Sequence, residues 1–451
     1  MSNGFLDGFF KLSEKKTTVR TEIIAGLTTF MAVAYIIIVN PEILAQAGIP
    51  KPAAIAATVW TAFWATALMG LWANYPVAVA PGMGINAFFT YTVVLSFGLS
   101  WQTALGAVFV SGVIFFILTL GGIRKAIINA VPMNIKLAIG VGIGVFIAFI
   151  GFQNSGIVVG SKVTLVELGQ VANLDFSSAN GQAPLLSCVG VIFTGVMMRL
   201  EVRGAILLGI MFTTAAGMFL GACPTPSCLG DIISFDTPSL FGPSGAFGQL
   251  DIIGALTYGV FGIIFTFTIV ELFDNIGSLI GVTRRAGLMK PDGNIENLDR
   301  ALTSDAVGTM AGAVMGTSTV VSYVESAAGV AEGGRTGLTA LTVAVLFPVA
   351  LLFAPLISLV PAFATAPALI VVGALMMSEA VNLKLGDITE SIPVFLTIVM
   401  MPLTASIANG FAFGFVSYTL LKIFSGRIRE VSWVMIVVSL SFIINFHLRL
   451  H

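Results

Sequence analysis

Long apolar runs recur along this whole chain and decide what it can fold into. Several approach the roughly 17–25 residues that a helix needs to cross a bilayer, such as 21–40 and 53–72. Of the 451 residues, 57% are hydrophobic and only 10% are charged. Soluble domains carry roughly 25% charged residues. The sequence therefore predicts an all-α integral membrane protein that crosses the bilayer many times.

Fourteen apolar spans are expected to be membrane-spanning segments. They cover residues 21–40, 53–72, 76–97, 101–121, 132–153, 184–198, 204–221, 255–283, 301–315, 317–331, 337–356, 359–378, 391–408 and 410–424. A last apolar stretch, 431–446, is shorter, and the sequence leaves open whether it is an interfacial helix or an extra crossing.

Basic residues predict the orientation of these spans. Lys and Arg gather before residue 21 and near residues 124, 200, 285, 335 and 427, whereas the loop at 222–250 carries Asp231 and Asp236 and no basic residue. Basic loops stay in the cytoplasm. With a cytoplasmic N-terminus, fourteen spans place every basic cluster on the cytoplasmic side.

Several function classes are disfavoured by composition. The net charge of −1 gives no reason to expect a nucleic-acid partner. His447 and His451 are the only histidines, so we expect no metal and no cofactor in the spans. No nucleophile–base pair stands out, which argues against an enzyme. Cys223 and Cys228 could form a disulfide if their loop faces an oxidising compartment.

The two halves of the chain resemble each other. "QTALGAVFVSGVIFFILTL" at 102–120 parallels "TGLTALTVAVLFPVALLF" at 336–353, and "VPMNIKLAIGVGIG" at 131–144 parallels "VPAFATAPALIVVG" at 360–373. Gly82 and Gly316 recur at a similar offset. Seven spans per half is an odd number, so the second half must enter the membrane upside down. The pattern predicts a 7+7 inverted repeat, as in many secondary transporters. The alternative is that any two Ala/Gly/Val-rich spans look alike.

The third span of each half is interrupted. "VAVAPGMGINAFFTY" at 77–91 contains Pro81, Gly82 and Gly84, and "MGTSTVVSYVESAAGVAEGG" at 315–334 opens with Gly316 and a Thr-Ser-Thr run suited to capping a helix. We expect a short extended stub in segments 3 and 10, each followed by a helix whose N-terminus lies at the midplane. The alternative is that these glycines only permit close helix packing.

Two carboxylates interrupt the apolar span 255–283. Glu271 and Asp274 are three residues apart and share a helix face, which Ser278 continues. A carboxylate at the bilayer centre costs roughly 2.5–3.5 kcal/mol, so these side chains must face a polar cavity or each other. The functional interpretation is a substrate and proton site; the alternative is a buried network that only holds helices together.

The chemistry of the cargo can also be bounded. No Lys or Arg lies mid-span near the breaks, which disfavours an inorganic anion. Carboxylates and the Asn86 carboxamide suit a planar ligand rich in N–H donors, which describes a nucleobase. The aromatic candidates for ring contacts are Phe30, Phe88, Phe89 and Tyr323.

Long motifs in this chain resemble those of the nucleobase–cation symporters, in the AzgA-like branch of purine permeases. They are "GMGINAFF", "VELFDNIGSLIGVTRRAGL" and "GTSTVVSYVESAAGVAEGGRTGLTA", with further similarity near both ends. The resemblance implies the uracil-permease fold, in which a core domain holds the substrate and rocks against a gate domain. It implies core domain at 18–125 and 250–356, gate domain at 126–225 and 357–425, and a tail at 426–451.

The resemblance also implies a function and a set of site residues. Family members are proton symporters of the cytoplasmic membrane, and related folds often form homodimers. The implied substrate-site residues are Asn86, Phe88, Glu271, Asp274, Thr317, Ser318 and Glu325. Glu271, Asp274 and Glu325 would also couple protons. The family commonly has Asp at the first carboxylate of the eighth span, and Glu271 departs from this, which puts the substrate preference in doubt.

The resulting hypothesis is proton-coupled uptake of a purine nucleobase. Adenine is favoured because the third span and the "MMP" run of the thirteenth look closest to adenine permeases. The alternatives are guanine or hypoxanthine, xanthine or uracil on the same fold, and a passive nucleobase channel.

Overall fold

The computed structural model describes residues 4–120, 131–169, 179–227, 229–235, 238, 240–241, 245–257, 261–288 and 295–449. Some predictions from the sequence fall outside these ranges, among them the basic residues Arg124, Lys125 and Lys290, and Asp236 and Cys228 in the acidic loop. Cys223, the other member of the suggested disulfide, is a free thiol next to the Thr214 carbonyl.

In the first half, long helices alternate with short turns. The helices are α1 (Gly4–Phe10), α2 (Val19–Val33), α3 (Ile36–Gln46), α4 (Lys51–Leu68), α5 (Met83–Ala87), α6 (Trp101–Leu120), α8 (Met133–Asn154), α9 (Ala179–Arg199) and α10 (Ala205–Phe219). Two π-helical segments, η1 (Met69–Ala73) and η2 (Phe88–Ser96), extend α4 and α5. The strands are β1 (Val79–Pro81), β2 (Val158–Ser161) and β3 (Leu165–Leu168).

The second half has a similar order of elements. Its helices are α11 (Ile252–Thr257), α12 (Phe261–Arg285), α13 (Leu298–Met315), α14 (Ala327–Ala331), α15 (Gly337–Ala350), α16 (Ala354–Leu359), α17 (Ala362–Met377), α18 (Ile388–Leu403), α19 (Ile407–Phe424) and α20 (Trp433–Arg449). It also contains strand β4 (Val320–Ser322) and the 3₁₀ turns η3 (Leu229–Asp231), η4 (Val324–Ser326), η5 (Leu351–Phe353), η6 (Ser378–Asn382) and η7 (Ile428–Glu430).

The predicted helical membrane protein is confirmed. Within the described ranges, eight helices are long and apolar enough to cross a bilayer, and shorter apolar helices accompany them. The apolar stretch after α19 is also helical. On α20, Met435 and Phe442 are buried against α19 and α12, while Trp433 and Leu440 are exposed.

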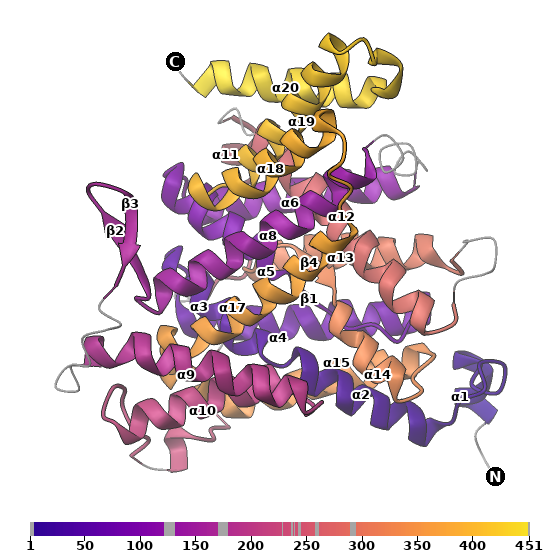
Figure 1. The fold of residues 1–451 in the computed structure, drawn as a ribbon. Helices are drawn as coiled ribbons and strands as arrows, with labels where there is room; N and C mark the ends of the chain where they lie inside the picture. Colours follow the sequence, from indigo (N-terminus) through magenta and orange to yellow (C-terminus); the bar gives the residue numbers. More distant parts are fainter. Residues whose placement is uncertain are drawn as a thin grey trace.

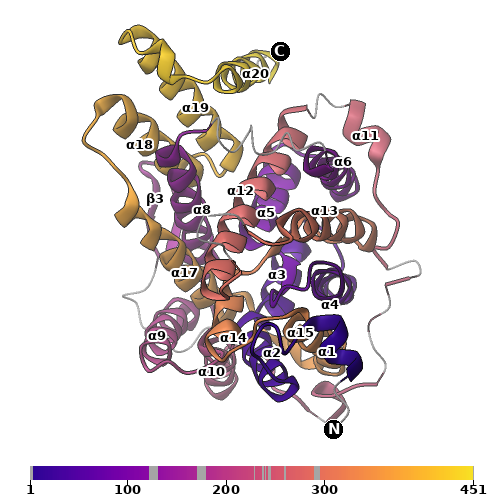
Figure 2. The ribbon, with the colours of Figure 1, turned by 90° about the vertical axis from the view of Figure 1, so that its right-hand side faces the viewer.

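The helices form two groups, which Figure 2 shows from one end. In one group α8 packs on α17 and α18, α9 packs on α10, and α18 packs on α19. In the other group α15 packs on α2 and α4, and α13 packs on α4 and α6. Each group therefore combines elements from both halves of the chain, which lie side by side in Figure 1.

A two-stranded ribbon joins the halves at the centre of the second group. Strands β1 and β4 pair antiparallel, with Ala80 opposite Val321. Two further backbone bonds extend the ribbon, from Gly82 N to Thr319 O at 3.1 Å and from Tyr323 N to Ala78 O at 2.9 Å. In a membrane interior each backbone group must find a protein partner, and here each broken segment supplies the other's partners.

The ribbon corrects two details of the sequence interpretation. Gly316 does not correspond to Gly82: it closes α13 with a φ of 97°, and the two extending bonds match Gly82 with Tyr323. The run Thr317–Thr319 does not cap a helix, because β4 follows it and the next helical turn starts only at Val324. A second hairpin, β2–β3, was not anticipated from the sequence.

Helix-end contacts repeat in the two halves. Glu22, in the first turn of α2, accepts a hydrogen bond from Thr339 Oγ1 in the first turn of α15 at 2.6 Å. Asp251, just before α11, accepts one from Thr103 Oγ1 in the first turn of α6 at 3.3 Å. Glu22 also accepts hydrogen bonds from the backbone N–H groups of Arg335, Thr336 and Thr339. One carboxylate therefore pairs with the free N–H groups at the start of α15.

Close approach of helices depends on glycine pairs. A Cβ at Gly373 of α17 would lie 2.3 Å from the Gly144 carbonyl oxygen of α8, and a Cβ at Gly144 would lie 2.7 Å from the Gly373 oxygen. No other residue lets two backbones meet at this distance. By contrast, a Cβ at Gly140, one turn earlier on α8, would meet nothing within 4 Å.

We therefore predict that Gly373→Ala destabilises the protein by about 1–3 kcal/mol, the usual cost of overpacking a core. The readout is thermal unfolding of the detergent-solubilised protein. Gly140→Ala is the matched control and should melt at or slightly above the wild-type temperature, since alanine favours the helix. Equal melting temperatures for the two variants would contradict the close contact of α8 and α17.

Candidate functional site

Two threonines hold the strands of the ribbon in the same way. Thr66 of α4 accepts from Val79 N at 2.9 Å and donates to Val79 O at 2.8 Å. Thr309 of α13 accepts from Val320 N at 3.2 Å, but its hydroxyl proton goes to Glu271 Oε1, which is closer at 2.5 Å than Val320 O at 3.4 Å. The threonine contacts to the backbone are thus alike at β1 and β4, and the difference is that Thr309, at β4, also donates to a carboxylate.

A neutral polar cluster fills one end of the ribbon. Asn86 of α5 donates to Asn40 Oδ1 of α3, and the Ser318 hydroxyl donates to Asn86 Oδ1. Asn40 in turn donates to the hydroxyls of Thr58 at 2.8 Å and Thr317 at 3.0 Å. All five side chains are fully buried, and their mutual hydrogen bonds satisfy the two carboxamides without any carboxylate.

Acidic and phenolic side chains gather at the other end. Glu325 of η4 accepts a hydrogen bond from the Tyr35 hydroxyl at 2.8 Å. Tyr323 donates to Pro81 O at 2.6 Å, and its ring lies 6.5 Å from the Tyr35 ring. Asp274 of α12 is close enough to Glu325 for their charges to interact. Both carboxylates are partly exposed, whereas the two tyrosines are buried.

Glu271 is separated from this pair although it is on the same helix. Its side chain is fully buried toward α13, where Oε1 receives the Thr309 hydroxyl and Oε2 has no hydrogen-bond partner among the described residues. Its charge interacts with that of Asp305. Asp305, also fully buried, receives the Ser322 hydroxyl at 3.0 Å on both carboxylate oxygens and interacts with Asp274. Asp305 is therefore the electrostatic link between Glu271 and the exposed pair.

The structure brings the predicted site residues together in two sets. Asn86, Thr317 and Ser318 form one, Asp274 and Glu325 form the other, and Glu271 lies behind the second set. Phe88 belongs to neither set, because it is fully buried against Phe267, with ring centroids 4.9 Å apart. Phe30 packs on Phe347, and Phe89 is fully buried.

Four further site residues were missed from the sequence: Tyr35, Asn40, Asn275 and Asp305. Asn275 accepts from Ser322 N at 2.8 Å and keeps a buried side-chain N–H group without a partner. Two signals were available, because Asn40 interrupts "IIIVNPEIL" and Asp305 lies in 301–315, which the sequence predicts to be a membrane-spanning segment. Tyr35 and Asn275 carry no such signal, since their role depends on which residue faces them.

The break is closed on one side and open on the other. Gly84 of α5 lies against Ile143 of α8 so closely that a Cβ would come within 2.5 Å of that side chain. Val324 of η4, next to Glu325, is 54% exposed, although Tyr323 and Tyr35 nearby are both buried. The surface of the protein is therefore nearest to Asp274 and Glu325 on the η4 side. Within the described residues, no group of three His, Cys, Asp or Glu side chains could hold a metal ion.

The shared scaffold gives a sharp test of the Glu271 environment. Thr309→Val and Thr66→Val each remove one buried acceptor from a valine N–H, which costs about 1–3 kcal/mol. Each variant also removes a donor, to Val79 O in Thr66→Val and to Glu271 in Thr309→Val. We expect Thr309→Val to lower the unfolding temperature more, because it leaves the fully buried Glu271 carboxyl without a donor among the described residues. Thermal unfolding of both variants at neutral pH measures this. A larger loss in Thr66→Val would mean that Thr309 does not support Glu271.

Solved structures with the same fold are transporters. The transmembrane domain of the cyanobacterial bicarbonate transporter BicA matches with a TM-score of 0.63 at 15% identity, covering 86% of this chain and 96% of that chain. The murine Slc26a9 anion transporter in its inward-facing state matches with a TM-score of 0.62 at 10% identity, covering 94% of this chain and 72% of that one. At these identities the similarity concerns the fold alone.

Sequence relatives are much closer. The adenine permease AdeQ of Escherichia coli (strain K12) is 43% identical over 442 residues, which cover 98% of this chain and 96% of that protein. The guanine/hypoxanthine permease PbuO of Bacillus subtilis (strain 168) is 41% identical over 441 residues, which cover 97% and 99%. The model of the Permease family matches residues 20–413. The chain therefore belongs to the Permease family, in the branch that contains adenine and guanine/hypoxanthine permeases, and it is a membrane transporter rather than an enzyme.

Proposed function

We propose that this protein takes up purine nucleobases across the cytoplasmic membrane together with protons. The observation that carries the proposal is the partly exposed pair Asp274 and Glu325 at a break between two paired strands, next to Tyr35 and Tyr323. The relatives supply the substrate class, since one is an adenine permease and another a guanine/hypoxanthine permease.

Recognition follows from the donors and acceptors in the site. Glu325 and Asp274 offer carboxylate oxygens to the N–H groups of a purine, which has several along one edge. The rings of Tyr35 and Tyr323, whose planes are 55° apart, would supply aromatic contacts beside them. Asn86, Thr317 and Ser318 complete the site by fixing the far end of the ribbon, and Phe88 packs beneath it.

Proton coupling is proposed for Glu271, Asp274 and Glu325, with Asp305 as the link between them. Neighbouring carboxylates repel each other's charge, which favours protonation of one of them, and that proton belongs to the cluster as a whole rather than to one residue. Glu271 has one hydrogen-bonded and one free oxygen, and the free oxygen can hold a proton without breaking the bond to Thr309. Protonation of the cluster would neutralise it as the loaded site moves through the membrane.

We further propose a fourteen-segment architecture built as a 7+7 inverted repeat. The paired strands, the matched threonines Thr66 and Thr309, and the matched contacts of Glu22 and Asp251 support it. The core domain comprises 18–125 and 250–356, the gate domain comprises 126–225 and 357–425, and 426–451 forms the tail. The N-terminus is placed in the cytoplasm, and a homodimer is expected. Movement of the core against the gate would expose the break to each side in turn.

The closest rivals keep the fold and change the cargo. Relatives at 43% and 41% identity have different purines in their names, so similarity alone does not separate adenine from guanine or hypoxanthine. Uptake of labelled adenine with unlabelled hypoxanthine, guanine, xanthine and uracil as competitors ranks the candidates. Stronger competition by uracil than by any purine would overturn the proposed substrate class.

Glu325→Gln should abolish adenine binding and uptake at neutral pH, because it replaces an acceptor of the purine N–H groups with a mixed donor–acceptor group. Tyr35→Phe, which removes the 2.8 Å bond to Glu325, should weaken binding about tenfold and leave uptake measurable. Glu201→Gln, on an exposed carboxylate, is the matched control and should transport normally. If Glu325→Gln accumulated adenine as well as the wild type at equal amounts of protein, the proposed role of Glu325 in the site would be wrong.

Glu271→Gln should retain part of the adenine binding but lose proton-driven accumulation, because the glutamine still accepts from Thr309 and carries no proton to release. The measurement is adenine accumulation in proteoliposomes with and without a pH gradient. The wild type should lose accumulation when an ionophore collapses the gradient, and Glu271→Gln should only equilibrate adenine in both conditions. A wild type that is insensitive to the ionophore would instead favour a passive channel.

A further inference from the structure

A pocket outside the transport site is built from three separate parts of the chain. It encloses about 320 Å³ between the N-terminal segment, the end of the α4–η1 helix and the residues that lead into α13. Asn74 closes the helix in a left-handed conformation, donates to Phe10 O at 3.0 Å and accepts from Gly337 N at 2.7 Å. These contacts hold α1 against α4 and α15, as Figure 2 shows.

The second connection involves the residues before α13. Lys15 forms an ion pair with Glu296 at 2.7 Å, and the Tyr75 hydroxyl donates to the Glu296 carbonyl. Phe10 and Leu12 are buried against Leu338, so the N-terminal segment is packed as well as hydrogen-bonded. Specific contacts between side chains therefore hold the walls of the pocket in place.

The lining is basic on one side and apolar on the other. Lys11, Lys15 and Arg300 provide three cations. Among the described lining residues Glu296 is the one carboxylate, and it is paired with Lys15, while Lys11 also makes an exposed ion pair with Glu14 at 3.4 Å. Leu71 and Trp72, on the last turn of a helix that can span the membrane, are 49% and 56% exposed. This combination fits a phosphate group joined to a hydrocarbon chain, because the cations bind the phosphate and the apolar wall borders the chain.

The position agrees with a lipid as occupant. The helix Lys51–Ala73 ends at the pocket, and Trp at such an end prefers the level of the lipid headgroups. The same end carries the basic N-terminal segment, so with the proposed orientation the pocket faces the cytoplasmic leaflet, where anionic lipids attract clusters of Lys and Arg.

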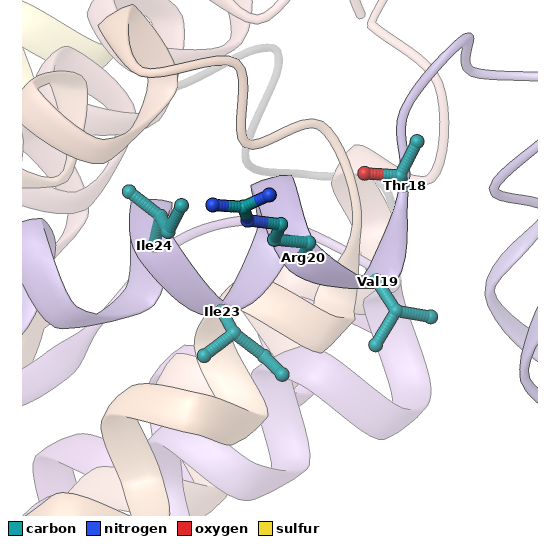
Figure 3. Close-up of a pocket in the computed structure, with 5 residues that line it drawn as sticks. All are labelled: Thr18, Val19, Arg20, Ile23 and Ile24. Carbon is teal, nitrogen blue, oxygen red and sulfur yellow. The ribbon is translucent and has the colours of Figure 1, made fainter.

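A larger groove on the same part of the molecule lacks these features. Figure 3 shows it along the start of α2, where Thr18, Val19, Arg20, Ile23 and Ile24 line it. All five come from one short stretch of chain, and Arg20 is the only charged side chain among them. The groove offers no second element to enclose a headgroup, which makes Arg20 a useful control position.

We propose that the pocket of Lys11, Lys15, Arg300 and Trp72 binds one anionic phospholipid of the cytoplasmic leaflet. The lipid fastens the N-terminal segment to α4 and to the start of α13. The inference rests on the proposed orientation and is independent of which nucleobase the protein carries.

Native mass spectrometry of the purified full chain tests this with phosphatidylglycerol and phosphatidylcholine as probes. We expect one tightly retained phosphatidylglycerol, and an affinity about tenfold or more lower in K11Q/R300Q, since each basic residue near a lipid surface contributes to binding. K16Q/R20Q removes two nearby cations outside the pocket and should retain the lipid. R300K keeps the charge and should also retain it. Wild-type helical content by circular dichroism and an unchanged size-exclusion profile confirm that K11Q/R300Q is folded.

Each other outcome would overturn the proposal. Equal loss in K11Q/R300Q and K16Q/R20Q would mean general surface attraction instead of a site. Equal retention of phosphatidylcholine would remove the role of the cations, and displacement of the lipid by millimolar inorganic phosphate would identify a free-phosphate site. Brominated phosphatidylglycerol gives a second readout, because it should quench a fluorescence component that disappears in Trp72→Phe. If quenching is unchanged in Trp72→Phe, the lipid chain does not lie along Trp72.

Discussion

The pairing of β1 with β4 is the constraint on which the rest of the structure depends. A helix that stops inside a membrane leaves backbone N–H and C=O groups that no lipid can satisfy. Here two stopped segments satisfy each other across the ribbon, and Thr66 and Thr309 satisfy the outer edge at Val79 and Val320. Neither half of the chain could keep its break without the other, so the helices around the ribbon must assemble from both halves.

This arrangement explains why carboxylates are tolerated at the centre of an apolar molecule. Three of the four have donors supplied by the elements that frame the ribbon: Thr309 for Glu271, Ser322 for Asp305 and Tyr35 for Glu325. Leaving a buried charge without such partners costs several kcal/mol. The donors come from helices and strands that are themselves fixed by backbone pairing. A movable ligand can therefore enter and leave while the acidic groups keep their positions.

Much of this could be predicted from local sequence. Apolar runs indicated the helices, and Pro and Gly at 81–84 indicated the break in the third span. The residues that correspond in the two halves at the break were harder to predict. Gly316 looked like the counterpart of Gly82 in the sequence, and only the strand register shows that the counterpart is Tyr323. The shared helix face of Glu271 and Asp274 also misled, since the two point to α13 and η4 respectively. Partners such as Tyr35, Asn275 and Asp305 depend on contacts between distant segments, which no periodicity encodes.

The ribbon has nearly twofold backbone symmetry, yet its two ends carry opposite chemistry. At one end Asn86, Asn40 and Ser318 form a closed neutral cluster, and Gly84 lies tight against Ile143. At the other end the carboxyl groups of Glu325 and Asp274 are partly exposed, and Val324 is exposed beside them. A symmetric scaffold with symmetric side chains would bind a ligand equally at both ends and would have no preferred place for a proton. The difference between the ends is therefore what the proposed function depends on: it places nucleobase binding and proton exchange at the acidic end, and the neutral end is the part of the ribbon against which α8 packs.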